Sequence, residues 1–222
     1  MRGTVKVKFR MILAGTLLVV GPVSTTRGQE CGREVDAEFE AYSWPYQYAL
    51  QADCGIAVGP DHILTTTNWG RRVWDRNGGL LVSETLDEFF GFAVAGDPIV
   101  AFDQQSSRWF VLSLVGSDRL GLGVSHTSDP VDRNNWDFHQ SPQFPFFPDY
   151  PHMSIGAEQV FFSWQRANEA GRRAEIAWAD KATLLNGQLP PVTRHLIEQI
   201  PNQDDITYIR ASSAPMAIIP IM

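Results

Sequence analysis

The chain has 222 residues, with 18 Lys and Arg against 25 Asp and Glu, so its formal net charge is −7. This acidic balance excludes the attraction to phosphate backbones that nucleic-acid binding requires. Gly (18), Pro (14), Trp (7) and Phe (13) are plentiful, while charged residues make up only 19% of the chain. Such a composition favours short strands joined by turns, and we predict a soluble all-β protein.

Residues 1–28 have the layout of a secretory signal peptide. A cationic start without acidic residues is followed by the apolar run 11–23 and then by small polar residues. The apolar run is shorter than the roughly 20 residues that span a bilayer. We therefore expect a secreted, periplasmic or extracellular protein, with no lipid anchor and no membrane span after cleavage.

Residues 29–54 are predicted to form an aromatic lead-in to the fold, and they contain both cysteines, Cys31 and Cys54. An exported protein with two cysteines usually pairs them, and closing this loop adds roughly 3 kcal/mol of stability on the chain-entropy model. The alternative is two buried free thiols. No His or Cys lies at ligand spacing beside either cysteine, so no metal site is predicted there.

Residues 55–222 show strand patterns in groups of four, separated by turn signals. Asn77-Gly78, the strongest short hairpin signal, joins the last two strands of the first group. The first group is predicted at 55–58, 62–67, 71–75 and 80–84; the second at 98–102, 108–114, 120–126 and 136–139; the third at 151–156, 159–165, 174–179 and 192–197.

The groups recur about every fifty residues, and four strands per unit at this period are typical of β-propeller blades. The runs 108–114 and 159–165 are apolar almost throughout, so both are expected to be covered on both faces. Asp180 to Gly187 is predicted to form a short capped helix. Residues 206–221 resemble the start of a further blade, so we predict an incomplete propeller of about three to four blades. A β-sandwich is the competing architecture.

Several phrases resemble those of secreted bacterial β-propeller proteins of the sialidase-like group. They are Gly96–Asp103 with Ser107–Val111, Val124–Pro130 followed by Trp136, Asp149–Pro151, and Asp180–Gly187. The resemblance implies the propeller fold and carries no activity with it. Sialidase Asp boxes require a glycine and a spacing that the stretch from Ser125 to Trp136 lacks, and no arginine cluster or Tyr–Glu pair is recognisable.

Aspartates recur just before the first strand of each predicted blade. In a propeller the first strand is innermost, so these carboxylates are expected near one mouth of the central channel. They could bind a cation, or serve as acid and base in glycoside hydrolysis. The alternative is that each fixes a turn at a blade junction by accepting backbone hydrogen bonds. The residues are Asp53, Asp97, Asp149 and the pair Asp204 and Asp205.

The loop 129–137 is rich in side-chain oxygens from Asp129, Asp132 and Asn134. Ca²⁺ is the cofactor that such a loop could hold, and Asx turns without an ion are the alternative. At loop ends, Trp69 and Trp136 are candidate platforms for stacking a sugar. No metal site and no catalytic constellation of nucleophile and base is predicted elsewhere.

The favoured hypothesis is an exported, non-catalytic propeller module with a binding or structural role. Its expected partners are a carbohydrate or an extracellular protein, and unpaired blade edges could drive self-association. The alternative is a glycoside hydrolase of sialidase-like fold that uses the channel-mouth carboxylates.

Overall fold

A computed structural model of the chain describes residues 4–12, 35–45, 53–167 and 173–197. The chain divides into two compact units, Met1–Leu50 and Gln51–Met222. In the first unit, β1 (Thr4–Ile12) pairs antiparallel with β2 (Val35–Pro45). β1 lies within the predicted signal peptide and β2 within the predicted lead-in, and export of the chain stays a prediction.

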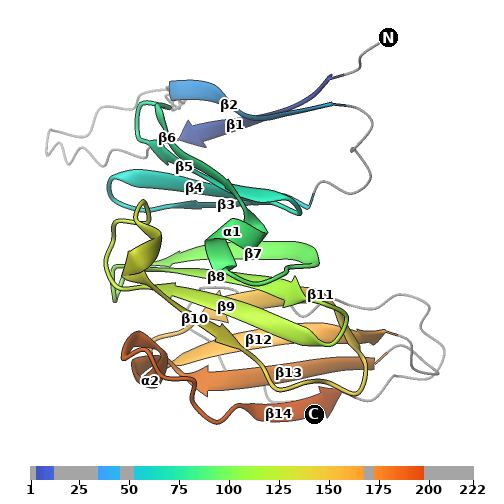
Figure 1. Cartoon of the computed structure of the whole chain (residues 1–222). Helices are drawn as coiled ribbons and strands as arrows, with labels where there is room; N and C mark the ends of the chain where they lie inside the picture. Colours follow the sequence, from blue (N-terminus) through green and yellow to red (C-terminus); the bar gives the residue numbers. More distant parts are fainter. Residues whose placement is uncertain (1–3, 13–34, 46–52, 168–172, 198–222) are drawn as a thin grey trace, which may run out of the picture. The chain divides into compact units, whose positions relative to one another are not determined.

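The second unit contains three antiparallel sheets of four strands each, and in every sheet the strands follow one another in chain order (Figure 1). The all-β fold class is therefore confirmed. The first sheet holds β3 (Gly55–Val58), β4 (His62–Thr67), β5 (Gly70–Asp75) and β6 (Leu80–Thr85). The second holds β7 (Gly96–Asp103), β8 (Arg108–Val115), β9 (Arg119–Ser125) and β10 (Trp136–Gln140). The third holds β11 (Phe147–Ile155), β12 (Gln159–Ala167), β13 (Arg173–Asp180) and β14 (Thr193–Ile197).

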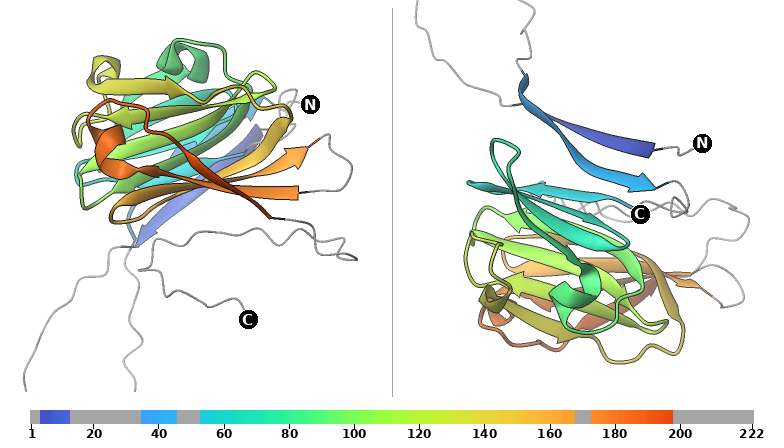
Figure 2. Two further views of the ribbon diagram at one scale, coloured as in Figure 1. Left: turned by 90° about the horizontal axis from the view of Figure 1, so that it is seen from below. Right: turned by 45° about the horizontal axis from the view of Figure 1, so that its top comes forward.

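The second sheet lies between the other two, and a cluster of buried hydrophobic side chains lies in each of the two interfaces (Figures 1 and 2). Leu64, Val73 and Trp109 belong to the core between the first and second sheets. Phe110 and Phe162 belong to the core between the second and third. Because β8 supplies side chains to both cores, nearly all of its residues are buried, as its apolar sequence predicts.

The strand β12 departs from the expectation that it is covered on both faces. Val160, Phe162 and Trp164 are buried, while Phe161 and Ser163 between them are only partly buried. The buried residues face the second sheet. No further sheet covers the opposite face in the described part of the chain. Burial therefore alternates along the strand.

Two short helices connect strands. α1 (Leu86–Phe90) was not predicted, although Thr85 and Glu88 form a capping box at its start and Gly91 ends it in a left-handed conformation with φ 76°. α2 (Lys181–Leu185) lies where a capped helix was predicted, and Asp180 accepts a hydrogen bond from the backbone of Thr183.

Buried cations join neighbouring sheets. Lys181, only 4% exposed, donates to Asp103 (3.0 Å), to the side chain of Gln105 (3.1 Å) and to the carbonyl of Gly156 (2.8 Å), and so ties α2 to the second and third sheets. These bonds satisfy the ammonium group inside the protein, which is the condition for burying a charge without a large cost.

Arg71 has the corresponding role between the first and second sheets, and it is fully buried. Its Nε donates to Glu84 (2.6 Å) and its Nη1 to the carbonyl of Pro130 (2.9 Å). The guanidinium also lies 4.0 Å from the ring centroid of Phe89, a cation–π contact.

Candidate functional site

Three of the predicted aspartates come together at the start of the first strands of the three sheets. Asp53 precedes β3, Asp97 lies at the start of β7 and Asp149 near the start of β11. The strands β3 and β7 are in contact, and so are β7 and β11. The charges of Asp53 and Asp149 both raise the pKa of Asp97, so the three carboxyl groups lie near one another. Asp204 and Asp205 lie outside the described residues.

Asn68, which the sequence reasoning missed, links the first and second sheets at this end. Its Nδ2 donates to Asp53 Oδ2 (2.9 Å), and its Oδ1 accepts from the backbone N–H of Asp97 (2.7 Å). Gly96 has φ 123° and lies so close that an added Cβ would stand 3.0 Å from Asn68 Oδ1, which explains a glycine here. The donor to Asp53 is thus a side-chain amide and not the backbone N–H of the alternative interpretation.

The first strands of the second and third sheets begin with the same irregularity. Regular pairing lapses between Gly96 and Ile99 in β7, and between Asp149 and His152 in β11. In each lapse a residue directly before a proline has positive φ: Asp97 (50°) and Tyr150 (54°). Asp97 thus corresponds to Tyr150, not to Asp149, and the carboxylates come from neighbouring positions of the two bulges.

Asp97 ionises less readily than an ordinary aspartate, because it is partly buried and lies near two other carboxylates. Burial raises the pKa of Asp97 to about 6, and the charges of Asp53 and Asp149 and the hydrogen bond with Asp53 act in the same direction. A backbone hydrogen bond from Tyr150 opposes them. A carboxyl group of this kind exchanges a proton near neutral pH, which ordinary surface aspartates do not.

Two exposed aromatic side chains lie at the same end. Trp69 follows Asn68 in the turn between β4 and β5 and is 56% exposed. Tyr150, whose backbone N–H bonds Asp97, is 43% exposed. Trp136 is not a platform, because it is only 5% exposed and packs edge-on against Phe89 in the core. The sequence alone could not separate Trp69 from Trp136, since both lie beside predicted turns.

The oxygen-rich loop uses part of its side-chain oxygens internally. Asp129 Oδ1 accepts from the backbone of Val131 (2.9 Å), and Asp132 Oδ1 accepts from the backbone of Asn134 (2.9 Å) at the start of the 3₁₀ turn Arg133–Asn135. Asp129, Asp132 and Asn134 are all exposed. These are the Asx turns of the alternative interpretation.

The predicted disulfide is not tested, because Cys31 lies outside the described residues. Cys54 is exposed, next to Asp53. Partial burial and the charge of Asp53 raise the pKa of its thiol. A raised pKa leaves less thiolate at neutral pH and so makes this cysteine a poorer nucleophile.

No protein-family model, curated protein or solved structure matches this chain. In the described ranges, no group of three or more His, Cys, Asp and Glu side chains is arranged to hold a metal ion. Nor does the described part contain a helix with the length and hydrophobicity that crossing a membrane takes. What the chain does must therefore be argued from its own geometry.

Proposed function

We propose that this chain is an exported, non-catalytic binding module built of β-propeller blades, and that it holds a carbohydrate at the start of the first strands described above. The observation that carries the proposal is that Asn68 joins Asp53 and Asp97 at this end. The exposed residues Trp69 and Tyr150 directly follow Asn68 and Asp149 in the chain. Aromatic faces stack on the C–H faces of sugar rings, and carboxylates and amides bond their hydroxyls.

The propeller architecture is supported by connectivity and packing. Each sheet is a meander that begins with the strand adjoining the next sheet, and these first strands, β3, β7 and β11, contact one another in series. Sheets that radiate from adjoining first strands are the arrangement of propeller blades. The resemblance to sialidase-like propeller phrases points the same way.

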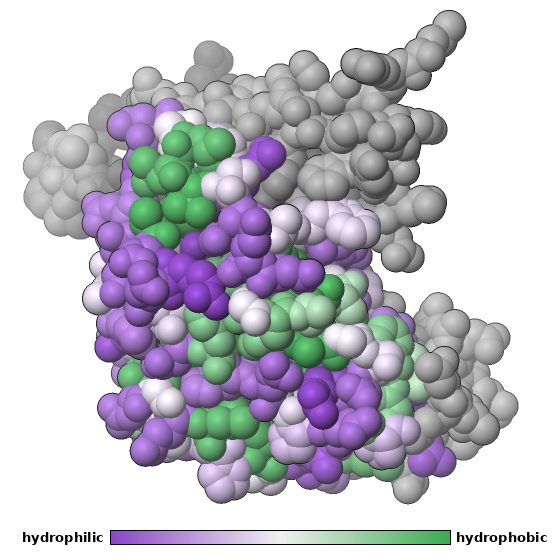
Figure 3. Space-filling view, viewed as in Figure 1, coloured by the Kyte–Doolittle hydropathy of each residue, from purple (hydrophilic) through white to green (hydrophobic). Residues whose placement is uncertain are grey.

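Self-association through blade surfaces belongs to the same proposal. Leu80 and Leu81 of the outer strand β6 are 49% and 48% exposed, and Figure 3 shows a hydrophobic patch over that part of the face, bordered by hydrophilic side chains. Exposed apolar side chains on an outer strand favour contact with another protein surface.

The test is binding of the purified chain to an array of neutral and acidic glycans. We expect retention on at least one glycan class, and a loss of about tenfold in affinity for Trp69→Ala and for Tyr150→Ala, about 1.4 kcal/mol each. Leu189→Ala is the control, because Leu189 is similarly exposed but lies outside this site. The proposal would be refuted if the native chain bound no glycan, or if the Trp69→Ala and Tyr150→Ala variants bound as tightly as the native chain.

A glycoside hydrolase is the second candidate, and the pKa of Asp97, about 6, favours it, since a general acid needs such a value. A glycoside hydrolase needs a second carboxyl group roughly 5–10 Å from the first, and Asp53 is already bonded to Asn68 (2.9 Å). Asp149 would have to be the partner. Hydrolysis of aryl glycosides by the native chain, abolished in Asp97→Asn, would establish this activity in place of simple binding.

A further inference from the structure

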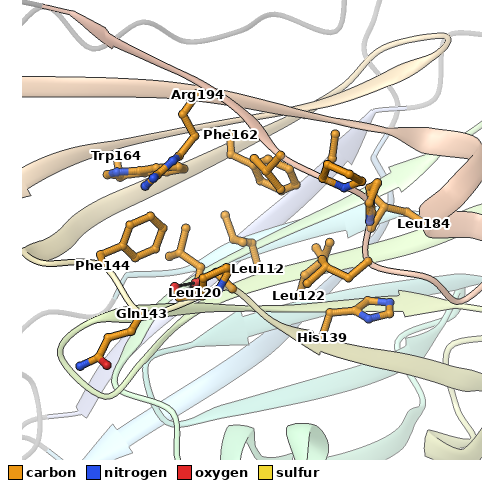
Figure 4. A pocket seen from close by; sticks show the side chains of 17 residues that line it. Leu112, Leu120, Leu122, His139, Gln143, Phe144, Phe162, Trp164, Leu184 and Arg194 are labelled. Carbon is orange, nitrogen blue, oxygen red and sulfur yellow. Dashed lines mark hydrogen bonds between the residues drawn. The ribbon is translucent and has the colours of Figure 1, made fainter.

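A cavity of about 290 Å³ lies between the second and third sheets, away from the aspartate cluster (Figure 4). Leu112, Leu120 and Leu122 of the second sheet form one wall. Phe162 and Trp164 of β12 face them from the third sheet, and Leu184 of α2 lies at one side. The cavity is thus part of the interface between two sheets, where ligand sites commonly form.

The volume limits what could fit. A cavity of roughly 150 Å³ lined by Leu, Ile and Phe holds benzene, so about twice that volume accommodates a two-ring molecule. It lies at the lower end of the range of small-molecule pockets, roughly 300–1,000 Å³, and excludes an oligosaccharide or a peptide. The occupant is therefore a small and compact molecule.

The side chains favour a flat, aromatic occupant. Phe144 and Trp164 line the cavity with their ring centroids 5.1 Å apart and their planes tilted by 56°. Such rings offer both faces and edges to a further ring, and an aromatic pair contributes beyond its buried area. His139 on β10 also lines the cavity, and burial lowers the pKa of its imidazole, which is therefore neutral at pH 7.

Among the described residues, one charged side chain lines this cavity, and it is cationic. Arg194 of β14 is about half exposed, and its guanidinium lies 5.6 Å from the ring centroid of Phe144. Its Nε stands 3.7 Å from Glu175 Oε1, which is longer than the roughly 2.7–2.9 Å of a charge-assisted hydrogen bond. The planar guanidinium has five donors, so it can also bind the carboxylate of a ligand.

We infer that this cavity is a binding site for an aromatic carboxylate of one or two rings. The rings lie between the leucine wall and Phe162 with Trp164, and the carboxylate meets Arg194 at the rim. Among the described residues no acidic side chain lines the cavity, and the carboxylate of Glu175 beside Arg194 accepts a hydrogen bond from Trp164 Nε1 (3.2 Å). This inference does not depend on the carbohydrate proposal, since the two sites use different residues.

The experiment is calorimetric titration of the full chain with 2-naphthoate, and with 2-naphthamide as the uncharged analogue. Native protein should bind the carboxylate more tightly than the amide. Arg194→Gln should weaken naphthoate binding about tenfold and leave the amide unchanged. Arg173→Gln is the matched control, because Arg173 is an exposed arginine of the neighbouring strand β13 and does not line the cavity.

Filling the cavity gives the second readout. Ala179 is 2% exposed and lines the cavity, so Ala179→Leu should abolish binding of both probes. Val192→Trp changes a 38% exposed residue of the rim and should do the same if Ala179→Leu does not fold. Lack of naphthoate binding by a cooperatively melting native chain would overturn the inference. So would unchanged binding in Val192→Trp, or equal loss of both probes in Arg194→Gln.

Discussion

Replacing Lys181 with methionine tests whether the ion pair between the second and third sheets stabilises the fold. The variant keeps most of the apolar stem of the side chain and removes the ammonium group that donates to Asp103, Gln105 and Gly156. Removing one partner of a buried pair costs about 3–5 kcal/mol. Asp103 keeps hydrogen bonds from Ser106 and from the backbone of Gln105, so we expect the lower end, about 3 kcal/mol.

The pH dependence of this loss separates charge from packing. Burial alone would raise the pKa of Asp103, but hydrogen bonds from Ser106 and Lys181 and the lysine charge hold it below its ordinary value. A carboxyl group with a lowered pKa contributes stability above its unfolded pKa and loses it as the pH falls through the folded pKa. The difference between native chain and variant should therefore be largest near pH 7 and shrink below pH 4.

Urea denaturation at several pH values measures the difference, and thermal unfolding should show a midpoint lowered by about 6–12 °C at pH 7. The exposed Arg173→Met is the control and should stay within about 0.5 kcal/mol of the native chain. A loss below about 1 kcal/mol would refute the reasoning. Strict additivity with Asp103→Asn in a double-mutant cycle would refute it as well.

Three further substitutions test other parts of the fold. Because the pKa of Asp97 is raised to about 6, its ionisation destabilises the folded state as the pH rises from 4 through 6. Asp97→Asn should therefore raise the free energy of unfolding by about 1 kcal/mol at pH 7.5 and leave it unchanged at pH 4, in urea titrations at both pH values. An added methyl in Gly59→Ala would overlap the fully buried ring of Trp109, and thermal melts should show a loss of about 1–3 kcal/mol. Asp180→Ala removes the cap of α2 and should cost about 1 kcal/mol by denaturation, whereas Asp180→Asn should not.

Most strands of the second unit could be predicted because their signals are local. Apolar runs bounded by turn residues, and Asn77-Gly78 above all, depend on nothing outside a short window. α1 has an equally local signal in Thr85 and Glu88, but the run that follows is too short for helical periodicity to show. The partly buried face of β12 could not be predicted, since its apolar residues do not reveal which face a neighbouring sheet covers.

The N-terminal residues show two patterns at once. In the stretch Thr4–Ile12, apolar and cationic residues alternate, which is the pattern of a half-buried strand, and the structure forms β1 there. The same lysines and arginine supply the positive charge that predicts a signal peptide. A single sequence does not separate the two interpretations, because the charges that mark a targeting segment also serve as the polar positions of a strand.

The aspartate cluster could be predicted in outline but not in its geometry. The predicted propeller brings the first strands of its blades together, and this expectation places Asp53, Asp97 and Asp149 at one end. Asn68 was missed because it lies between two strands of the first sheet, and its partnership with Asp97 joins residues 29 positions apart. Asp97 and Asp149 occupy different positions in their strands because each strand has a bulge there. No turn motif in the sequence predicts these bulges.

The strand β7 has an aspartate near each end, and the surroundings of the two shift their pKa values in opposite directions. At the end of the strand, Lys181 and Ser106 hold the pKa of Asp103 down, so its charge is compensated and serves to join sheets. Near the start, Asp53 and Asp149 add to the effect of burial and push the pKa of Asp97 up. A fold gains nothing in stability from gathering like charges, and such arrangements cluster at functional sites. The same strand thus separates a structural carboxylate from one better suited to a ligand, and exposed Trp69 and Tyr150 lie beside the second.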